Sequence, residues 1–96
     1  MDSREQYQPE VTIVIMRECI RIKFVKKEAD ALNIYKRSTK NAEWLFTATV
    51  TNSPFDDFDV DLEEEMEYRF CGVKEKTEIG IPVTLSVDDL RHLNPT

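Results

Sequence analysis

Glycine is scarce in this sequence of 96 residues, which contains only two. There is therefore no glycine-rich loop of the kind that cradles phosphate groups, and most turns must be built from Asn, Asp, Lys and Glu. Histidine is scarcer still, since the one copy, His92, lies in a polar stretch beside Arg91 and Asn94. Such a stretch cannot hold a Ser-His or Cys-His pair for nucleophilic catalysis. We therefore expect a protein that is not an enzyme and uses no cofactor.

Long apolar runs are also missing, because none approaches the roughly 18 residues that a membrane-spanning helix needs. The first residues, Met-Asp-Ser-Arg-Glu-Gln, are polar where a signal peptide would be apolar. Basic residues are in the minority, with 13 Lys and Arg against 19 Asp and Glu, for a net charge of −6. The resulting field repels phosphate backbones and anionic headgroups. We expect neither a nucleic-acid partner nor membrane insertion.

Alternating apolar and polar residues run through most of the chain, which is 41% hydrophobic and 33% charged. This composition is typical of a globular domain, and the alternation is typical of half-buried strands. The strand-like segments are 11–16, 20–24, 31–37, 43–51, 68–74 and 81–87. We predict a single all-β domain over residues 11–87. It lies between a flexible N-terminal segment, 1–10, and a C-terminal tail or linker, 88–96.

Leu62 and Tyr68 stand six residues apart, the spacing of a tyrosine corner. In a Greek-key β-sandwich the chain leaves one sheet at the Leu and enters the other at the Tyr, whose hydroxyl bonds to backbone of the connecting arch. This spacing predicts an immunoglobulin-like Greek-key sandwich of about seven strands. Leu62 and the ring of Tyr68 are expected in its core.

Residues 32–38, 44–50, 55–57 and 62–70 together resemble a fibronectin type III domain. More narrowly, their order is similar to modules appended to microbial polysaccharide-processing enzymes and surface proteins. The resemblance implies a structural module that spaces and orients neighbouring domains, and a location outside the cell or at its surface. No Arg-Gly-Asp triplet is present, so the integrin-binding role of some members does not carry over.

Three features depart from that family pattern. Phe24 stands where many such domains place a Trp on the second strand, and Gly72 stands where the sixth usually has Val. The first strand runs into the second with almost no turn at residues 17–18. The placement of the first strand is therefore left open.

The two cysteines, Cys19 and Cys71, fall in the strands that a disulfide joins in antibody domains. There the corner Tyr precedes the second Cys by two residues, whereas here the offset from Tyr68 is three, which puts the thiol on the opposite face. Cysteines on the outer surfaces of two sheets would have Cα atoms farther apart than the ~7 Å limit for a disulfide. We predict free thiols, with a buried disulfide as the alternative.

An acidic run, residues 56–65, is the feature most suggestive of a metal site. Every second residue is a carboxylate that could contribute oxygen ligands to Ca²⁺, namely Asp57, Asp59, Asp61 and Glu63. In an extended strand such residues stand about 7 Å apart, too far to share one ion. We therefore favour a solvated strand face, whose inward side would carry Phe58, Val60 and Leu62, and keep the Ca²⁺ site as the alternative.

Tyr35 and Trp44 are the aromatic residues best placed to bind a partner. Tyr35 has outward parity on its strand, and exposed aromatic rings are common binding anchors. Two functions stay open: a monomeric spacer without a ligand of its own, and a module that binds a carbohydrate or a protein through these rings. The binding function requires that the two rings share one exposed patch.

Overall fold

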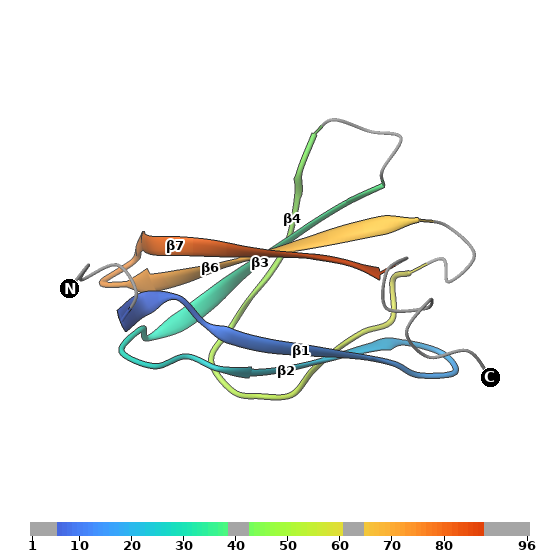
Figure 1. Ribbon diagram of the computed structural model, residues 1–96, viewed down its shortest axis with the longest axis horizontal. Helices are drawn as coiled ribbons and strands as arrows, with labels where there is room; N and C mark the ends of the chain where they lie inside the picture. Colours follow the sequence, from blue (N-terminus) through green and yellow to red (C-terminus); the bar gives the residue numbers. More distant parts are fainter. Residues whose placement is uncertain (1–5, 39–42, 61–64, 88–96) are drawn as a thin grey trace.

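The computed structural model describes residues 6–38, 43–60 and 65–87 and is built from β-strands (Figure 1). These are β1 (Glu10–Ile15), β2 (Ile20–Val25), β3 (Ala31–Ser38), β4 (Leu45–Val50), β5 (Phe55–Asp57), β6 (Met66–Lys74) and β7 (Thr77–Ser86). They form two antiparallel sheets, a three-stranded one in the order β1-β2-β5 and a four-stranded one in the order β4-β3-β6-β7. The predicted all-β fold of about seven strands is confirmed. Within the described ranges no helix is long and apolar enough to cross a membrane.

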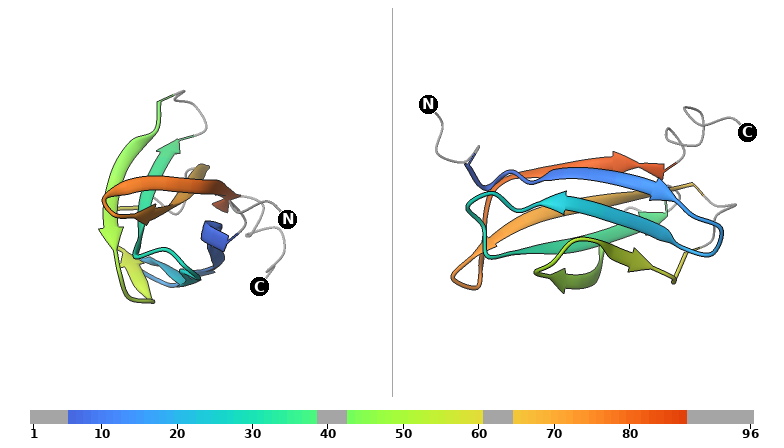
Figure 2. Two further views of the ribbon diagram at one scale, coloured as in Figure 1. Left: turned by 90° about the vertical axis from the view of Figure 1, so that its left-hand side faces the viewer. Right: turned by 90° about the horizontal axis from the view of Figure 1, so that it is seen from below.

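The two sheets stack as the layers of a sandwich (Figure 2). Alternation along each strand sends one set of side chains between the layers, because successive residues of a strand point to opposite faces. The inward residues that form the core come chiefly from β2, β3 and β6: Ile20, Ile22, Phe24, Leu32, Ile34, Met66, Tyr68 and Phe70. The chain changes sheet between β2 and β3, between β4 and β5, and between β5 and β6. Strands distant in sequence are thereby brought side by side.

The first two strands form a regular hairpin, in which Ile15 lies opposite Ile20. Residues 16–19 connect them, and the Met16 amide donates to the Cys19 carbonyl at 2.9 Å. The short connection that left the first strand's placement open therefore suffices for a tight turn.

The hairpin between β6 and β7 turns without glycine. Its two central residues, Glu75 and Lys76, have positive φ values of 52° and 66°. This is the backbone of a two-residue turn that follows the twist of the strands, usually built with Asn or Gly. Asp30 supports the turn by accepting a hydrogen bond from the Glu75 amide at 3.1 Å. The expectation that Lys and Glu serve in turns is met here.

Gly72 faces the interior from β6, at the position where the sequence resemblance led us to expect Val. A Cβ atom on Gly72 would lie 2.5 Å from the backbone carbonyl oxygen of Tyr7 and 3.4 Å from the Cβ of Ala29. The segment that precedes β1 therefore passes directly over this position. The departure at Gly72 is explained by that close approach, because no larger residue fits without moving backbone.

Candidate binding face and the polar network beneath it

A row of aromatic and cationic side chains lies on the outer face of the four-stranded sheet. Tyr35 of β3 lies opposite Phe46 of β4, and their rings meet edge to face with centroids 5.7 Å apart. Farther along, the Arg37 guanidinium lies 4.3 Å above the centre of the Trp44 ring, and its Nε donates to Glu67 at 3.1 Å. Contacts of this kind hold both the cation and the ring in place.

Tyr35 and Trp44 line one hollow of about 170 Å³, together with Arg69, Cys71 and Glu78. Both aromatic residues are half-buried, so neither belongs to the core. The two rings therefore share one hollow, in which both are partly exposed. Arg69 and Glu78 were missed by sequence reasoning, because nothing local shows that β6 and β7 bring them beside β3.

A chain of hydrogen bonds fixes Tyr35 within this hollow. The Tyr35 hydroxyl and the Asn33 amide, the latter at 2.8 Å, both donate to the Glu78 carboxylate, and Thr49 donates to the Asn33 side-chain oxygen at 2.6 Å. The bond to Glu78 raises the pKa of Tyr35 to about 12. Partial burial by itself would raise the pKa of Glu78, but the bonds from Tyr35 and Asn33 outweigh it and lower that pKa. At neutral pH the phenol is thus a neutral donor to an ionised carboxylate.

Both cysteines are free thiols, as predicted. They are not surface groups, however, because Cys19 is 6% exposed and Cys71 is 7% exposed. Cys71 does point to the outer side of β6, since it lines the hollow, but neighbouring side chains cover it. Burial raises the pKa of the Cys71 thiol. The prediction that the thiols lie on the outer surfaces of the sheets is therefore wrong, because both thiols are buried.

Tyr68 lies fully buried in the core, as the tyrosine-corner spacing predicts. Its hydroxyl donates to the Asp57 carboxylate at 2.6 Å, not to arch backbone as expected. Burial raises the pKa of Tyr68. Leu62, the other member of the predicted corner, lies outside the described residues. The hydroxyl's partner was misassigned because a carboxylate delivered by β5 lies within its reach.

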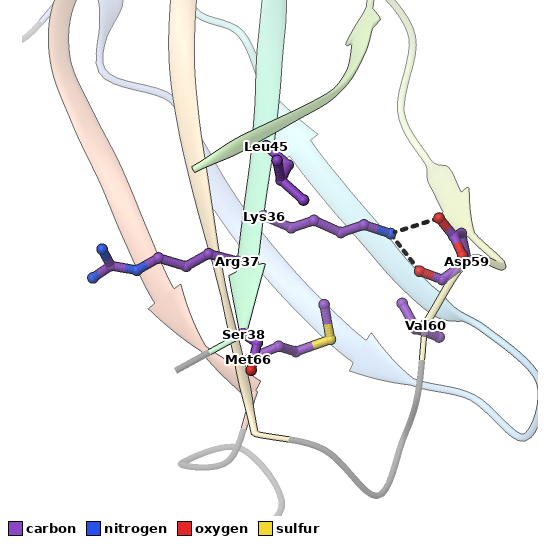
Figure 3. A pocket seen from close by; sticks show the side chains of 7 residues that line it. All are labelled: Lys36, Arg37, Ser38, Leu45, Asp59, Val60 and Met66. Atoms are coloured by element: carbon purple, nitrogen blue, oxygen red, sulfur yellow. Dashed lines mark hydrogen bonds and ion pairs between the residues drawn. The ribbon is translucent and has the colours of Figure 1, made fainter. Parts of the chain in front are cut away.

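Asp57 is the centre of a buried polar network and is 4% exposed. Besides the bond from the Tyr68 hydroxyl, the Asp57 carboxylate accepts hydrogen bonds from the Lys36 ammonium at 3.2 Å and from the Asp59 backbone amide at 3.1 Å. The ammonium also contacts the Asp59 carbonyl and lies 3.5 Å from the Asp59 carboxylate (Figure 3). A buried carboxylate needs such compensation, because an unpaired charge in the interior is costly.

The predicted faces of the acidic run are reversed at its start. Asp57 points inward, whereas Phe58, assigned to the core, is 67% exposed. The strand β5 ends at Asp57, so the period-two alternation does not continue into the following residues. Asp59 is solvent-exposed, as the solvated-face reading requires.

The oxygen atoms of Asp57 and Asp59 converge on an ammonium group. In the described part of the chain, no three His, Cys, Asp or Glu side chains gather in the way that a metal ion requires. Asp61 and Glu63 lie outside the described residues. The Ca²⁺ alternative for the complete run therefore stays a prediction, with two of its four carboxylates already engaged by Lys36.

Beside this network, two adjoining hollows of about 350 and 450 Å³ share Lys36, Leu45 and Asp59 in their lining. The larger is also lined by Phe46 and Phe58. Leu45, Phe46 and Phe58 are 57%, 60% and 67% exposed, which is high for large apolar side chains. Sequence reasoning missed this surface, because it placed Phe58 in the core.

Neither a scan against protein-family models nor a search of curated proteins finds a match for this chain. Its function is therefore inferred from the side chains themselves.

Proposed function

We propose that this chain is a non-catalytic interaction module, similar to fibronectin type III domains, that binds a protein partner through the hollow on the outer face of its four-stranded sheet. The observation that carries the proposal is the shared hollow of Tyr35, Trp44 and Arg69. Tyr, Trp and Arg are the residue types most enriched among those that dominate binding energy in protein interfaces.

The side chains in this hollow are held in place before any partner arrives. The Glu78 carboxylate holds the Tyr35 hydroxyl, and the Arg37 guanidinium covers the Trp44 ring. Such pre-organisation lowers the entropy cost of binding. It also favours a protein over a saccharide, because a sugar needs an open ring face for stacking and Arg37 already lies over one face of Trp44. By family resemblance, we expect the partner outside the cell or at its surface.

Selection of binders from a displayed peptide library would test this function, with the wild-type chain as bait. Counter-selection uses the double variant Tyr35→Ala, Trp44→Ala. Selected peptides should bind the double variant at least about tenfold more weakly, since aromatic anchors in interfaces each contribute more than a tenfold change. They should also change the fluorescence of Trp44, the single tryptophan of the chain. A matched control, Val25→Ala, removes an apolar side chain that is 54% exposed on the other sheet and should leave binding unchanged.

Equal binding to the wild type and the double variant would contradict the proposal. Fluorescence changes produced by soluble oligosaccharides, and abolished by the same double substitution, would replace the protein partner with a carbohydrate.

A spacer role is the second candidate, and the path of the chain favours it. The described chain enters β1 at one end of the sandwich and leaves β7 at the opposite end (Figure 1). Domains linked through such ends would follow one another in line. A fusion of two copies in tandem should therefore be extended in small-angle X-ray scattering. A compact particle with the two domains side by side would argue against the spacer.

A further inference from the structure

The strand β4 is an edge of the four-stranded sheet, with one irregularity in its register: Ile34 and Tyr35 of β3 are adjacent, but their partners Ala48 and Phe46 are two residues apart. It pairs with β3 alone among the described strands and ends the order β4-β3-β6-β7. Its sequence, Leu-Phe-Thr-Ala-Thr-Val, contains no charged residue and no Pro, the features that commonly keep another strand from pairing with an edge. The other edges differ: β5 has three residues, and β7 contains Pro82 at an irregularity in its register. The fourth edge, β1, has the charged residue Glu10 at its start and presents no large apolar side chain that is mostly exposed.

The edge is also accessible in space. The end of β3 and the start of β4 extend beyond the neighbouring strands of the sandwich (Figure 1). Within the described part of the chain, no backbone hydrogen bond from another segment reaches the free side of β4. Alternate residues of a strand turn their amide and carbonyl groups to opposite sides. About half of the six residues of β4 therefore offer these groups to an added strand.

A groove of about 450 Å³ accompanies this edge, and the apolar residues of its lining are Leu45 and Phe46 of β4 together with Phe55 and Phe58. A strand added beside β4 would project alternate side chains into the groove, because side chains of one strand alternate between the two faces of a sheet. Leu45 and Phe58, both more than half exposed, would be covered by them. The groove therefore supplies side-chain contacts to match the backbone pairing.

The charge of the groove is negative. Its lining contains one cation, Lys36, and three carboxylates, Asp56, Asp57 and Asp59. Lys36 engages Asp57, and Arg21 forms a two-point ion pair with Asp56 at 2.8 and 3.0 Å. The Asp59 carboxylate lies 3.5 Å from the Lys36 ammonium but stays fully exposed, on a chain whose net charge is −6. Such a surface attracts cationic segments and repels anionic ones.

We propose that an extended basic segment of a partner protein, with Lys or Arg alternating with apolar residues, binds as an additional strand on the free edge of β4. Its backbone pairs with Leu45–Val50, its apolar side chains fill the groove, and a cation meets Asp59. This surface lies on the edge of the sheet, and its lining shares no residue with the Tyr35 and Trp44 hollow, although the Phe46 ring contacts the Tyr35 ring. A second copy of this chain is a poorer occupant, because the Asp56 and Asp59 carboxylates of two chains of charge −6 would be brought together.

The test uses the complete chain and a blocked hexapeptide of alternating Lys and Val, followed by NMR titration and amide hydrogen exchange. The peptide should shift the β4 amide signals and slow their exchange, and it should bind more weakly as salt is raised from about 50 to 500 mM, because screening shortens the reach of surface charges. A hexapeptide of alternating Glu and Val should not bind. A version with every peptide nitrogen methylated should not bind either, because it cannot donate to the edge.

Two variants of the protein locate the site. Leu45→Lys places a positive charge in the groove and should weaken binding about tenfold or more. Val25→Lys adds the same charge at a residue 54% exposed on the other sheet and should alter the affinity less than about twofold. Phe58→Lys, at a side chain 67% exposed, is the second variant if Leu45→Lys melts at a much lower temperature than Val25→Lys.

Three results would overturn the proposal. The first is equal affinity of the methylated or the Glu-containing peptide, and the second is a set of shifts confined to the hollow around Trp44. The third is sedimentation of the wild type as a dimer that Leu45→Lys converts to a monomer, which would make a second copy the occupant. Because these readouts concern β4, they are distinct from loss of binding in the Tyr35 and Trp44 double variant.

Discussion

The side chain of Tyr68 offers a direct test of the buried polar network. Its ring is fully buried and its hydroxyl donates to the Asp57 carboxylate at 2.6 Å. Tyr68→Phe removes that bond and keeps the ring. Hydrogen bonds to charged groups contribute about 1.5–3 kcal/mol to stability. Because Asp57 would keep Lys36 at 3.2 Å and the Asp59 amide at 3.1 Å, we expect a loss of about 2 kcal/mol in the free energy of unfolding.

A double-mutant cycle with Asp57→Asn separates this bond from general effects of the substitution. Asp57→Asn alone should cost about 3 kcal/mol or more, since it breaks a buried ion pair and leaves the Lys36 ammonium with weaker partners. In that background Tyr68→Phe should cost less than in the wild type, with a coupling of about 1–2 kcal/mol. The cost of Asp57→Asn follows from the ion pair with Lys36 at 3.2 Å, and the coupling follows from the Tyr68 contact at 2.6 Å.

Urea unfolding of the four proteins, followed by circular dichroism, measures these free energies. Tyr35→Phe is the matched control, because the Tyr35 hydroxyl also donates to a carboxylate but outside the core, where a loss of no more than about 0.5 kcal/mol is expected. If Tyr68→Phe cost as little as Tyr35→Phe, or if its cost were the same with and without Asp57→Asn, the network would not be a stabilising unit.

Four further predictions concern the thiols, the close approach at Gly72, the Tyr35 phenol and calcium. Mass spectrometry without reductant should show two free thiols, whereas a mass two protons lower would show a disulfide. Ellman's reagent should react with Cys19 and Cys71 far more slowly in the native than in the unfolded protein, because both thiols are buried. Gly72→Ala should destabilise the fold by about 1–3 kcal/mol in urea, because its Cβ would meet backbone at 2.5 Å, and an unchanged midpoint would contradict that approach. The pKa of Tyr35 in the folded protein, about 12, lies above the ordinary tyrosine value of 10.0. The stability linked to the neutral form should therefore be complete below pH 10 and lost as pH rises toward 12. Tyrosinate absorbance of wild type and Tyr35→Phe measures this, and identical high-pH titrations would refute it. Millimolar Ca²⁺ should raise the melting temperature no more than Mg²⁺ does, and a larger rise that Asp59→Asn abolishes would establish a calcium site.

The strands and much of the core could be predicted from the sequence. The alternation of Ile20, Ile22 and Phe24 with charged residues places these three side chains in the interior, and all are buried. Strand alternation is a local property, because the pleat turns each successive side chain to the other face. For the same reason the outward direction of Cys71 followed from its offset from Tyr68, although the cover that buries it did not.

The acidic run shows where local reasoning stops. Its alternation continues in the sequence past Asp57, but the strand does not, so Asp57 and Phe58 lie on the sides opposite to those predicted. The change depends on Lys36, which is 21 residues away and compensates the buried carboxylate. No pattern within the run itself carries that information.

The sequence by itself determined the all-β class, the inward side chains of the strands 20–24 and 31–37, the use of Lys and Glu in turns and the free state of the two thiols. Only the tertiary structure decided which side chains meet, Tyr68 with Asp57 and Tyr35 with Glu78. It also decided that the exposed Phe58 lies beside the edge strand β4. The physical reason is that alternation acts between adjacent residues, whereas these contacts depend on the strand order. That order joins segments 11 to 43 residues apart, and short-range periodicity does not encode it.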